Sequence, residues 1–312
     1  MLRSCGGGVL RLGCAGLSPV AARESCKSAM LEINAALSDP GSGCNEDRVG
    51  HMFDTMWVID GATGTGDRLT DTPSDAAWLA ETADRAFKLL VKQHPDLDLA
   101  DLVRMAIYHC RIEFEHVRRA PPQPDETLPS AAFMLLRARG GGVEVVSLGD
   151  CGMLLEVGGA AQMIGTGQSA KERATIAQTQ AILAAAPELD GNGLVERLGP
   201  KLKADRKRMN RPGGYWILSL EPQAADHLRR AHFPIADGQS VALASDGFLR
   251  LIEVFGCETP ASLLAADRPA SAQRLSKRLR ELELAPASRE SFPRIKLHDD
   301  ASFIHATYRS AA

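Results

Sequence analysis

The 312-residue sequence lacks the features that mark membrane proteins and nucleic-acid-binding proteins. No apolar run approaches the ~18 residues that a membrane-spanning helix needs, so we expect no membrane partner. The formal net charge of −3 gives no reason to expect a nucleic acid or an anionic membrane as partner of the whole molecule. Internal repeats and long low-complexity linkers are also missing, which favours a single domain.

Paired cysteines and several hydrolase motifs are absent as well. The seven cysteines are odd in number and include no C-x-x-C pair, which indicates a reduced, cytoplasmic protein with unpaired thiols. No G-x-S-x-G nucleophile elbow occurs, so covalent catalysis by serine has no support. No H-E-x-x-H pair occurs, which argues against a zinc site on a helix.

The N-terminal residues include several arginines but no convincing targeting signal. Their apolar part, Val9-Leu10, is too short and too glycine-rich in its surroundings for a secretory signal. We therefore expect residues 1–27 to be poorly ordered and residues 28–312 to form one catalytic domain. We expect this domain to act as a monomer.

Apolar periodicity predicts two helices early in the chain. The first is expected to begin near Thr72 as N-cap, with Pro73 in the first turn, and to end before His94-Pro95. The second is expected to begin after Asp98 as N-cap, with one apolar stripe facing a core. Further helices are predicted over residues 171–189 and 194–209.

Strand-like runs separated by glycine-rich turns follow the first two helices. They cover residues 131–139, 143–148 and 153–157, and a last alternating strand is expected at 302–308. Two more strands and two more helices are expected before that last strand. Strands that occur in meanders, with helices grouped between them, favour an α+β fold over a parallel βαβ array.

Four short acidic patches lie where apolar runs meet turns. In each case a carboxylate stands at the end of an expected strand or beside one, as Asp60 does after the run Met56–Ile59. Side chains at strand ends can converge in space, and an all-oxygen cluster suits Mg²⁺ or Mn²⁺ rather than Zn²⁺. The four patches are Asn45-Glu46-Asp47, Ile59-Asp60-Gly61, Ser245-Asp246-Gly247 and Asp299-Asp300-Ala301-Ser302.

With Ser38-Asp39-x-Gly41 and Gly149-Asp150, these patches form an ordered series over roughly residues 38–308 that resembles the metal-dependent protein serine/threonine phosphatases of type 2C, in particular the bacterial-type members. The resemblance implies a four-layer α-β-β-α sandwich with two central antiparallel sheets. It also implies a substrate that is a phosphorylated protein, and hydrolysis of phosphoserine or phosphothreonine by water activated between two metal ions, Mn²⁺ or Mg²⁺.

The resemblance assigns the main roles to three carboxylates and one carbonyl. Asp60 would bridge the two ions, and the Gly61 carbonyl would bind one of them. Asp246 and Asp299 would bind the other. Asp60, Asp246 and Asp299 are thus the expected catalytic residues.

Three further carboxylates receive secondary roles, each with an alternative. Glu46 and Asp47 would act through metal-bound waters, whereas the alternative is a solvated loop pair. Asp150 would hold a third, weaker ion together with Asp246, whereas the alternative is a role in a hairpin turn. Asp300 occupies a position where the family usually has Asn, so we leave it out of the ligand set.

Two departures from the family pattern weaken substrate capture and leaving-group protonation. Ser42 stands where an arginine that clamps phosphate is expected, and Arg48 is not assigned that role. Ala62 stands where some members have a histidine proposed as general acid. Two alternatives therefore stay open: a catalytically weak or silent module that binds phosphoproteins, and a hydrolase of small phosphomonoesters.

A basic stretch runs from Arg197 to Arg211. A charge run on a helix is usually a solvated face. Alternatively, it would be a landing surface for an acidic phosphopeptide, because the flap beside the active site falls in the corresponding region of the family.

Overall fold

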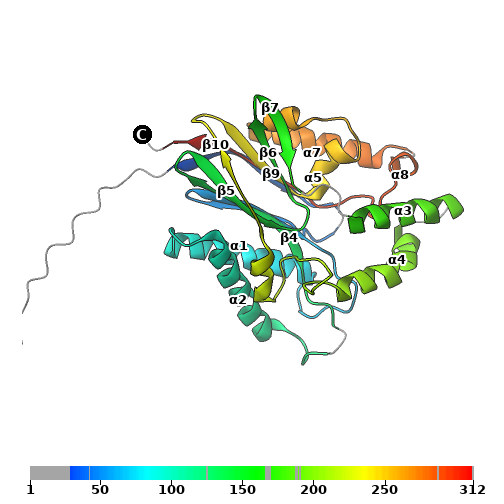
Figure 1. Ribbon diagram of the computed structural model, residues 1–312. Helices are drawn as coiled ribbons and strands as arrows, with labels where there is room; N and C mark the ends of the chain where they lie inside the picture. The colour runs from blue at the N-terminus through cyan, green and yellow to red at the C-terminus, as the bar shows by residue number, and fades with distance from the viewer. Residues whose placement is uncertain are drawn as a thin grey trace, which may run out of the picture.

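Two five-stranded antiparallel sheets lie face to face in the computed structural model, which describes residues 29–41, 43–123, 126–165, 170–186, 189, 191–286 and 288–310 (Figure 1). The first sheet has the order β1 (Met30–Asp39), β10 (Ala301–Arg309), β9 (Ser240–Ala244), β6 (Gly152–Val157) and β7 (Ala160–Ile164). The second sheet has the order β2 (Arg48–Met52), β3 (Thr55–Gly61), β4 (Ala131–Arg139), β5 (Gly142–Leu148) and β8 (Arg229–Pro234). The predicted α+β class is confirmed, as are the expected central strands β4, β5 and β6.

Strand β3 shows why the sheets stack as they do. Met56 and Val58 point into the core between the two sheets, while Trp57 and Ile59 point into the core between the second sheet and its helices. All four side chains are fully buried, so an unbroken apolar run is what a strand covered on both faces requires. The run stops at Asp60, where the strand reaches the end of the sandwich.

Helices cover the outer face of each sheet and produce the predicted four layers. Helices α1 (Asp75–Gln93) and α2 (Leu99–Val117) pack on the second sheet, on one side of the molecule (Figure 1). Helices α5 (Asp246–Glu253), α6 (Pro260–Leu264) and α7 (Pro269–Leu284) pack on the first sheet. In the part of the chain that is described, no helix is long and apolar enough to cross a membrane.

Helix α1 begins two residues later than its cap was predicted. Ser74, not Thr72, is the N-cap, and its side chain accepts a hydrogen bond from the Ala77 N–H. The Thr72 hydroxyl instead donates to the Ser74 carbonyl at 3.0 Å. The predicted cap of α2 is confirmed, since Asp98 accepts from the Ala100 N–H at 2.8 Å.

The remaining elements lie between β7 and β10. Helices α3 (Ala170–Ala185) and α4 (Gly191–Lys207) match the two helices expected there and stand at one end of the sandwich (Figure 1). Beyond them, the described residues contain the two expected strands, β8 and β9, but more helices than expected, because η1 (Pro222–His227) and α8 (Ser288–Ser291) join α5, α6 and α7. Strands β1, β2 and β7 were not predicted. Residues 1–27 lie outside the described residues, so the expectation for them stays a prediction.

Candidate metal centre

Carboxylates from both sheets meet at the end of the sandwich that α3 and α4 cover. Asp60 ends β3 of the second sheet, whereas Asp246 follows β9 and Asp299 precedes β10 of the first sheet. The backbone N–H of Asp246 donates to Asp60 Oδ2 at 3.4 Å, which links the two sheets directly. Asp47 and Asp150 lie near enough for their charges to act on Asp60. The structure therefore brings together the five aspartates that the sequence singled out.

Burial and mutual repulsion govern the protonation of three of these aspartates. Burial raises the pKa of Asp60 well above its usual range, and the charges of Asp246, Asp47, Asp150 and Asp299 raise it further. Burial likewise raises the pKa of Asp47 to about 7. It raises the pKa of Asp246 to about 6, and the charges of Asp150 and Asp299 add to this effect. A bound cation would reduce the repulsion between these carboxylates and favour their charged forms.

Asp299 is in a different electrostatic state from its neighbours. Its Oδ1 accepts from Lys296 Nζ at 2.9 Å, and its Oδ2 accepts from an Arg250 guanidinium nitrogen at 2.7 Å. Burial disfavours the charged form of Asp299, but Lys296 and Arg250 outweigh it and hold the pKa of this carboxyl below its usual value. The Asp299 carboxylate is therefore already neutralised by two side chains of the protein.

The glycines that follow Asp60 and Asp246 are required by close packing of the backbone. A Cβ added at Gly61 would collide with the Glu46 carbonyl oxygen. A Cβ added at Gly247 would collide with the Asp300 carbonyl oxygen. The Asp-Gly pairs thus permit two loops to approach the strand ends, which is how the loop carrying Glu46 reaches the site.

Glu46 and Asp47 are buried, which shows that the alternative of a solvated loop pair is wrong. The exposed fractions are 6% for Glu46 and 1% for Asp47. Both Glu46 carboxylate oxygens accept hydrogen bonds from hydroxyls, one from Thr63 and the other from Ser74. Asp47 Oδ2 is buried and accepts no hydrogen bond of ordinary length, although the hydroxyls of Ser245 and Ser302 lie near enough to act on the carboxyl. An orphaned carboxylate oxygen of this kind is consistent with a site for a cation or for water held by one.

Asp300 has a structural role that the sequence did not reveal. Its two carboxylate oxygens accept from the backbone N–H groups of Gly41 and Glu46, at 2.8 and 2.6 Å. The carboxylate therefore fixes the loop that contains Glu46 and Asp47 against the start of β10. The only signal in the sequence was that Asp300 adjoins a candidate ligand.

Asp150 lies in the turn that leads from β5 of the second sheet to β6 of the first sheet, so the alternative of a hairpin turn is wrong. It lies between β5 and β6, directly after Gly149, whose φ of +87° favours glycine. Its side chain also lines the cavity beside Asp60. The next residue, Cys151, is buried, and burial raises the pKa of its thiol well above the usual range. Cys151 is thus a small core residue.

The donor set fits a divalent ion at Asp60 and Asp246 better than at Asp299. Among the described residues, no group of three or more His, Cys, Asp or Glu side chains is placed so that it could hold a metal ion. Mg²⁺, however, is usually bound by one or two carboxylates together with waters and substrate phosphate, so such a cage is not needed. Asp60 and Asp246 offer all-oxygen ligation, and within the described part of the chain no cationic side chain is hydrogen-bonded to either carboxylate. Asp299, by contrast, has both oxygens engaged.

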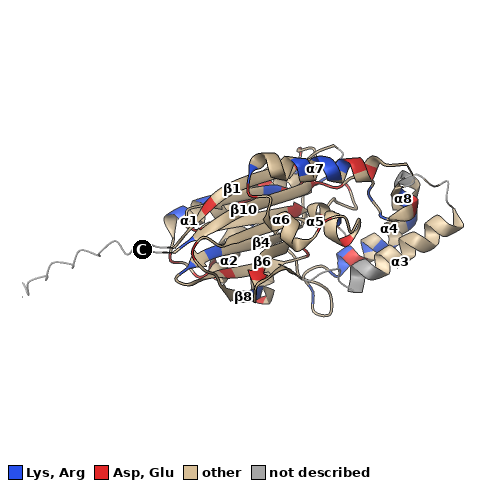
Figure 2. Cartoon of the chain, turned by 90° about the horizontal axis from the view of Figure 1, so that it is seen from above, with Lys and Arg blue, Asp and Glu red and all other residues tan. Residues whose placement is uncertain are grey.

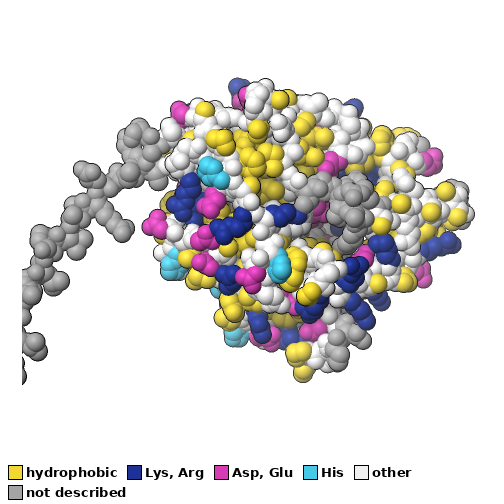
Figure 3. Space-filling model, viewed as in Figure 1, with side chains coloured by type: hydrophobic (Ala, Val, Ile, Leu, Met, Phe, Trp, Pro, Cys, Tyr) yellow, Lys and Arg dark blue, Asp and Glu magenta, His cyan; other side chains and the backbone are white. Residues whose placement is uncertain are grey.

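A cavity of about 520 Å³ opens from the carboxylates toward α3 and α4. Its wall is largely apolar and includes Ile176 and Leu202 from these helices. Lys and Arg residues occur on α4 in Figure 2, and basic side chains gather over the region of α4 in Figure 3. Lys203, Arg206 and Lys296 line the cavity itself.

The basic stretch is therefore not uniformly a solvated face. Arg206 donates to the carbonyls of Ala62 and Thr63 at 3.1 and 3.0 Å and to the Ser130 hydroxyl. It joins α4 to the loop that follows Asp60. Arg48 donates to backbone carbonyls of its own loop, which agrees with leaving it out of a phosphate clamp. Ser42, where the clamp was expected, lies outside the described residues.

Comparison with solved structures identifies the fold. The catalytic domain of serine threonine protein phosphatase PstP, in complex with two manganese ions, matches with a TM-score of 0.54 and 16% identity, covering 90% of this chain and 100% of that chain. PstP/Ppp of Mycobacterium tuberculosis gives the same TM-score of 0.54 and identity of 16%, covering 90% of this chain and 99% of that chain. The photosystem II phosphatase PBCP matches with a TM-score of 0.53 and 13% identity, covering 89% of this chain and 98% of that chain.

These neighbours are phosphatases, which are hydrolases, and the predicted resemblance is confirmed at the level of the fold. No protein-family profile matches the sequence, and no curated protein matches it significantly. At such low sequence identity the similarity shows a shared fold, whereas the chemistry depends on this chain's own residues.

Proposed function

We propose that this protein is a phosphatase that hydrolyses phosphoserine and phosphothreonine in proteins, with Mn²⁺ or Mg²⁺ bound at Asp60 and Asp246. The observation that carries the proposal is the convergence of buried, mutually repelling aspartates from both sheets at the mouth of one cavity. The shared fold with protein phosphatases supports it. The family resemblance would add the Gly61 carbonyl as a ligand and a second ion.

The reaction transfers a phosphoryl group to water. The P–O bond to the serine or threonine oxygen breaks, a new bond forms between phosphorus and the water oxygen, and the leaving oxygen takes up a proton. A bound divalent ion would neutralise phosphate charge and lower the pKa of the attacking water. Asp60 and Asp246 would hold this ion, while Asp300 keeps the loop of Glu46 and Asp47 in place beside it.

The test is hydrolysis of p-nitrophenyl phosphate and of a phosphothreonine peptide with Mn²⁺, compared with the same protein after metal removal and in excess EDTA. We expect turnover only with metal. Full turnover in EDTA would contradict the proposal. Binding of the phosphopeptide without turnover would instead favour the silent binding module that Ala62 suggests.

A second candidate, hydrolysis of small phosphomonoesters, is favoured by the shape of the site. The largely apolar cavity beside the aspartates would accept the organic part of a small phosphorylated molecule. Ile176 and Leu202, from the two helices α3 and α4, contribute to its wall. A higher kcat/KM for an apolar small phosphomonoester than for phosphopeptides would favour this candidate.

The proposal also includes a cytoplasmic location, a signalling role, a monomeric state and a phosphoprotein partner, with no nucleic acid or membrane as partner. The four cysteines that the structure describes, Cys44, Cys110, Cys151 and Cys257, are free thiols, which is compatible with a reducing compartment.

A further inference from the structure

Two cationic side chains reach Asp299 from different parts of the chain. Lys296 lies in the loop before β10 and donates to Oδ1, while Arg250 extends from α5 and donates to Oδ2. The two distances, 2.9 and 2.7 Å, are those of strong charge-assisted hydrogen bonds. Both side chains also line the cavity that opens beside Asp60.

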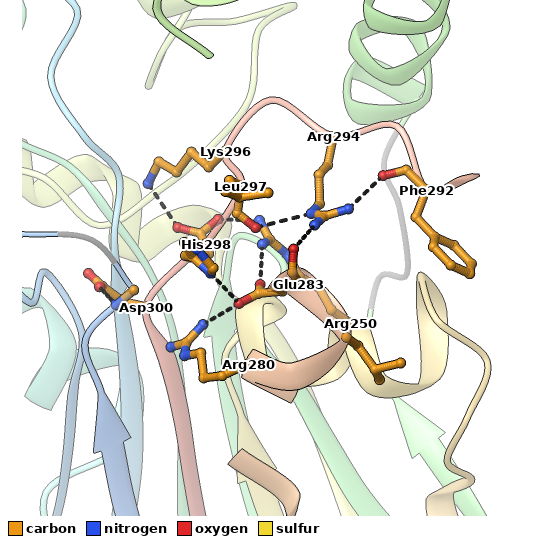
Figure 4. A network of polar contacts seen from close by, with 12 residues as sticks. Arg250, Arg280, Glu283, Phe292, Arg294, Lys296, Leu297, His298 and Asp300 are labelled. Atoms are coloured by element: carbon orange, nitrogen blue, oxygen red, sulfur yellow. Dashed lines mark hydrogen bonds and ion pairs between the residues drawn. The ribbon is translucent and has the colours of Figure 1, made fainter. Parts of the chain in front are cut away.

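Arg250 is held in this position by a second acidic residue. Its other guanidinium nitrogen donates to Glu283 Oε1 at 2.8 Å. Glu283 is fully buried as a side chain, and its Oε2 accepts from Arg280 at 2.7 Å and contacts His298 Nδ1 at 3.0 Å. Figure 4 shows these side chains converging on Glu283 from α5, α7 and the loop before β10. The guanidinium is therefore a fixed part of the site.

Lys296 differs from Arg250 because its charged group is more exposed to a ligand. An ammonium group has three N–H donors, and one is used by Asp299. The Lys296 side chain is 40% exposed, whereas that of Arg250 is 11% exposed. The positive charge of Lys296 also acts on Glu46 and Asp60, so its ammonium group faces the carboxylate cluster.

These contacts conflict with a divalent ion on Asp299. Such an ion would lie close to two positive side chains that are hydrogen-bonded to the same carboxylate, one of them fixed. Like charges repel strongly in a partly buried site. The conflict is smaller at Asp60 and Asp246, because neither carboxylate accepts a hydrogen bond from Lys296 or Arg250 and the charges of other aspartates act on both.

We propose that Lys296 and Arg250 take the place of one of two divalent ions, so that the centre holds a single ion at Asp60 and Asp246 and the Lys296 ammonium binds the phosphate on the side of Asp299. The inference rests on the proposed function for its substrate, but its metal content can be measured without any turnover.

The experiment is the Mn²⁺ content of the full chain, measured by equilibrium dialysis with elemental analysis and by electron paramagnetic resonance. We expect one Mn²⁺ for each wild-type chain, with the spectrum of an isolated ion. Lys296→Met removes the ammonium but keeps the length of the side chain, and it should raise the content above one. Lys203→Met is the matched control, since Lys203 lines the same cavity and is not a partner of Asp299; its Mn²⁺ content should equal that of wild type.

Two ions with a coupled spectrum in the wild-type protein would overturn the proposal, as would the absence of bound Mn²⁺. If Lys296→Met still binds one ion, the double variant Lys296→Met, Arg250→Met decides. A value of one in that variant, with circular dichroism like that of wild type, would also overturn it. A second readout is inorganic phosphate binding by calorimetry, which should weaken about 10-fold in Lys296→Met.

The two proposals fail in different ways. One bound ion without hydrolysis of any phosphomonoester would contradict the proposed function but not the single-ion centre. Two bound ions together with hydrolysis would contradict the single-ion centre but not the proposed function.

Discussion

The backbone N–H of Asp246 donates to the carboxylate of Asp60 across the gap between the two sheets, at 3.4 Å. Asp60 lies at the end of β3 and Asp246 follows β9, so each carboxylate comes directly after the apolar residues of a strand. The two sheets of the sandwich therefore hold the two carboxylates at a defined distance from each other. A metal site built on strand ends is held more precisely than one built on loops.

Asp60→Asn should abolish metal-dependent turnover while preserving the fold. Asn keeps the volume but loses the charge and one acceptor, and a loss in kcat on the order of 10²–10³ or more is expected when charge stabilisation is removed at this position. The measurement is kcat for p-nitrophenyl phosphate at saturating Mn²⁺, with circular dichroism to verify folding. Asp267→Asn, at an exposed site, is the control. Near wild-type kcat in Asp60→Asn would show that the residue has been misassigned.

Asp246→Asn should lower the affinity for Mn²⁺ as well as kcat. It leaves the backbone N–H that donates to Asp60 in place, so the geometry between the strands should persist. Calorimetric titration with Mn²⁺ checks this separately from kinetics. Unchanged Mn²⁺ affinity would remove Asp246 from the ligand set.

The metal-free protein should lose stability as the pH rises from about 4 to about 7. Burial raises the pKa of Asp47 to about 7, so between its unfolded value and that value the folded state binds more protons than the unfolded state. The free energy of unfolding therefore falls with rising pH in this window, by up to about 4 kcal/mol for a shift of this size. Urea denaturation in EDTA at several pH values measures the slope.

Asp47→Asn provides the matched comparison, because its side chain does not titrate. The slope should be smaller in this variant, and Mn²⁺ should restore stability to the wild-type protein near pH 8 by binding the folded state. Equal slopes in the two proteins would contradict the prediction.

The layers of the fold and most residues of the candidate site could be predicted because they follow from apolar runs and the residues at their ends. The run Met56–Ile59 predicted a buried strand and placed Asp60 at its end, and both held. The position of Asp299 beside other aspartates was expected, but its ion pair with Arg250 was not. The two residues are separated by 49 positions, and nothing in a single sequence reports which side chains meet at that separation.

Local competition explains the smaller errors. Thr72 and Ser74 are both residue types that favour the N-cap position, so residue type alone does not distinguish them. For Glu46 and Asp47 the alternative of a solvated loop pair was left open, but Gly61, at the end of β3, has no side chain to keep their loop out of the interior. The sequence alone does not reveal that the backbone at Gly61 lies against the backbone at Glu46.

Asp300→Ala should loosen the loop that carries Glu46 and Asp47. Two backbone N–H groups would lose their acceptor, at a cost of about 1–3 kcal/mol. Asp300→Asn keeps one acceptor oxygen and should fall between wild type and Ala. Urea unfolding with and without Mn²⁺ measures both variants. If Ala proved as stable as wild type, the two hydrogen bonds would contribute nothing measurable.

Arg206→Ala should separate α4 from the loop after Asp60 and weaken substrate binding. Its guanidinium donates to the carbonyls of Ala62 and Thr63 and to the hydroxyl of Ser130, so its removal eliminates the hydrogen bonds that close this side of the cavity. Losing a hydrogen bond to a charged group costs about 1.5–3 kcal/mol. Because these contacts lie beside the metal ligands without replacing one, KM for a phosphomonoester should rise about 10-fold while Mn²⁺ affinity stays as in wild type.

Arg206→Lys separates geometry from charge in the same position. A lysine keeps the positive charge but cannot reach several acceptors at once with a planar fork, so its KM should lie nearer to that of Ala than to that of wild type. Lys207→Ala, the next residue on α4, controls for a general loss of positive charge from this helix. If Arg206→Lys restored wild-type KM in full, attraction of the phosphate by charge, rather than the attachment of α4, would be the role of this residue.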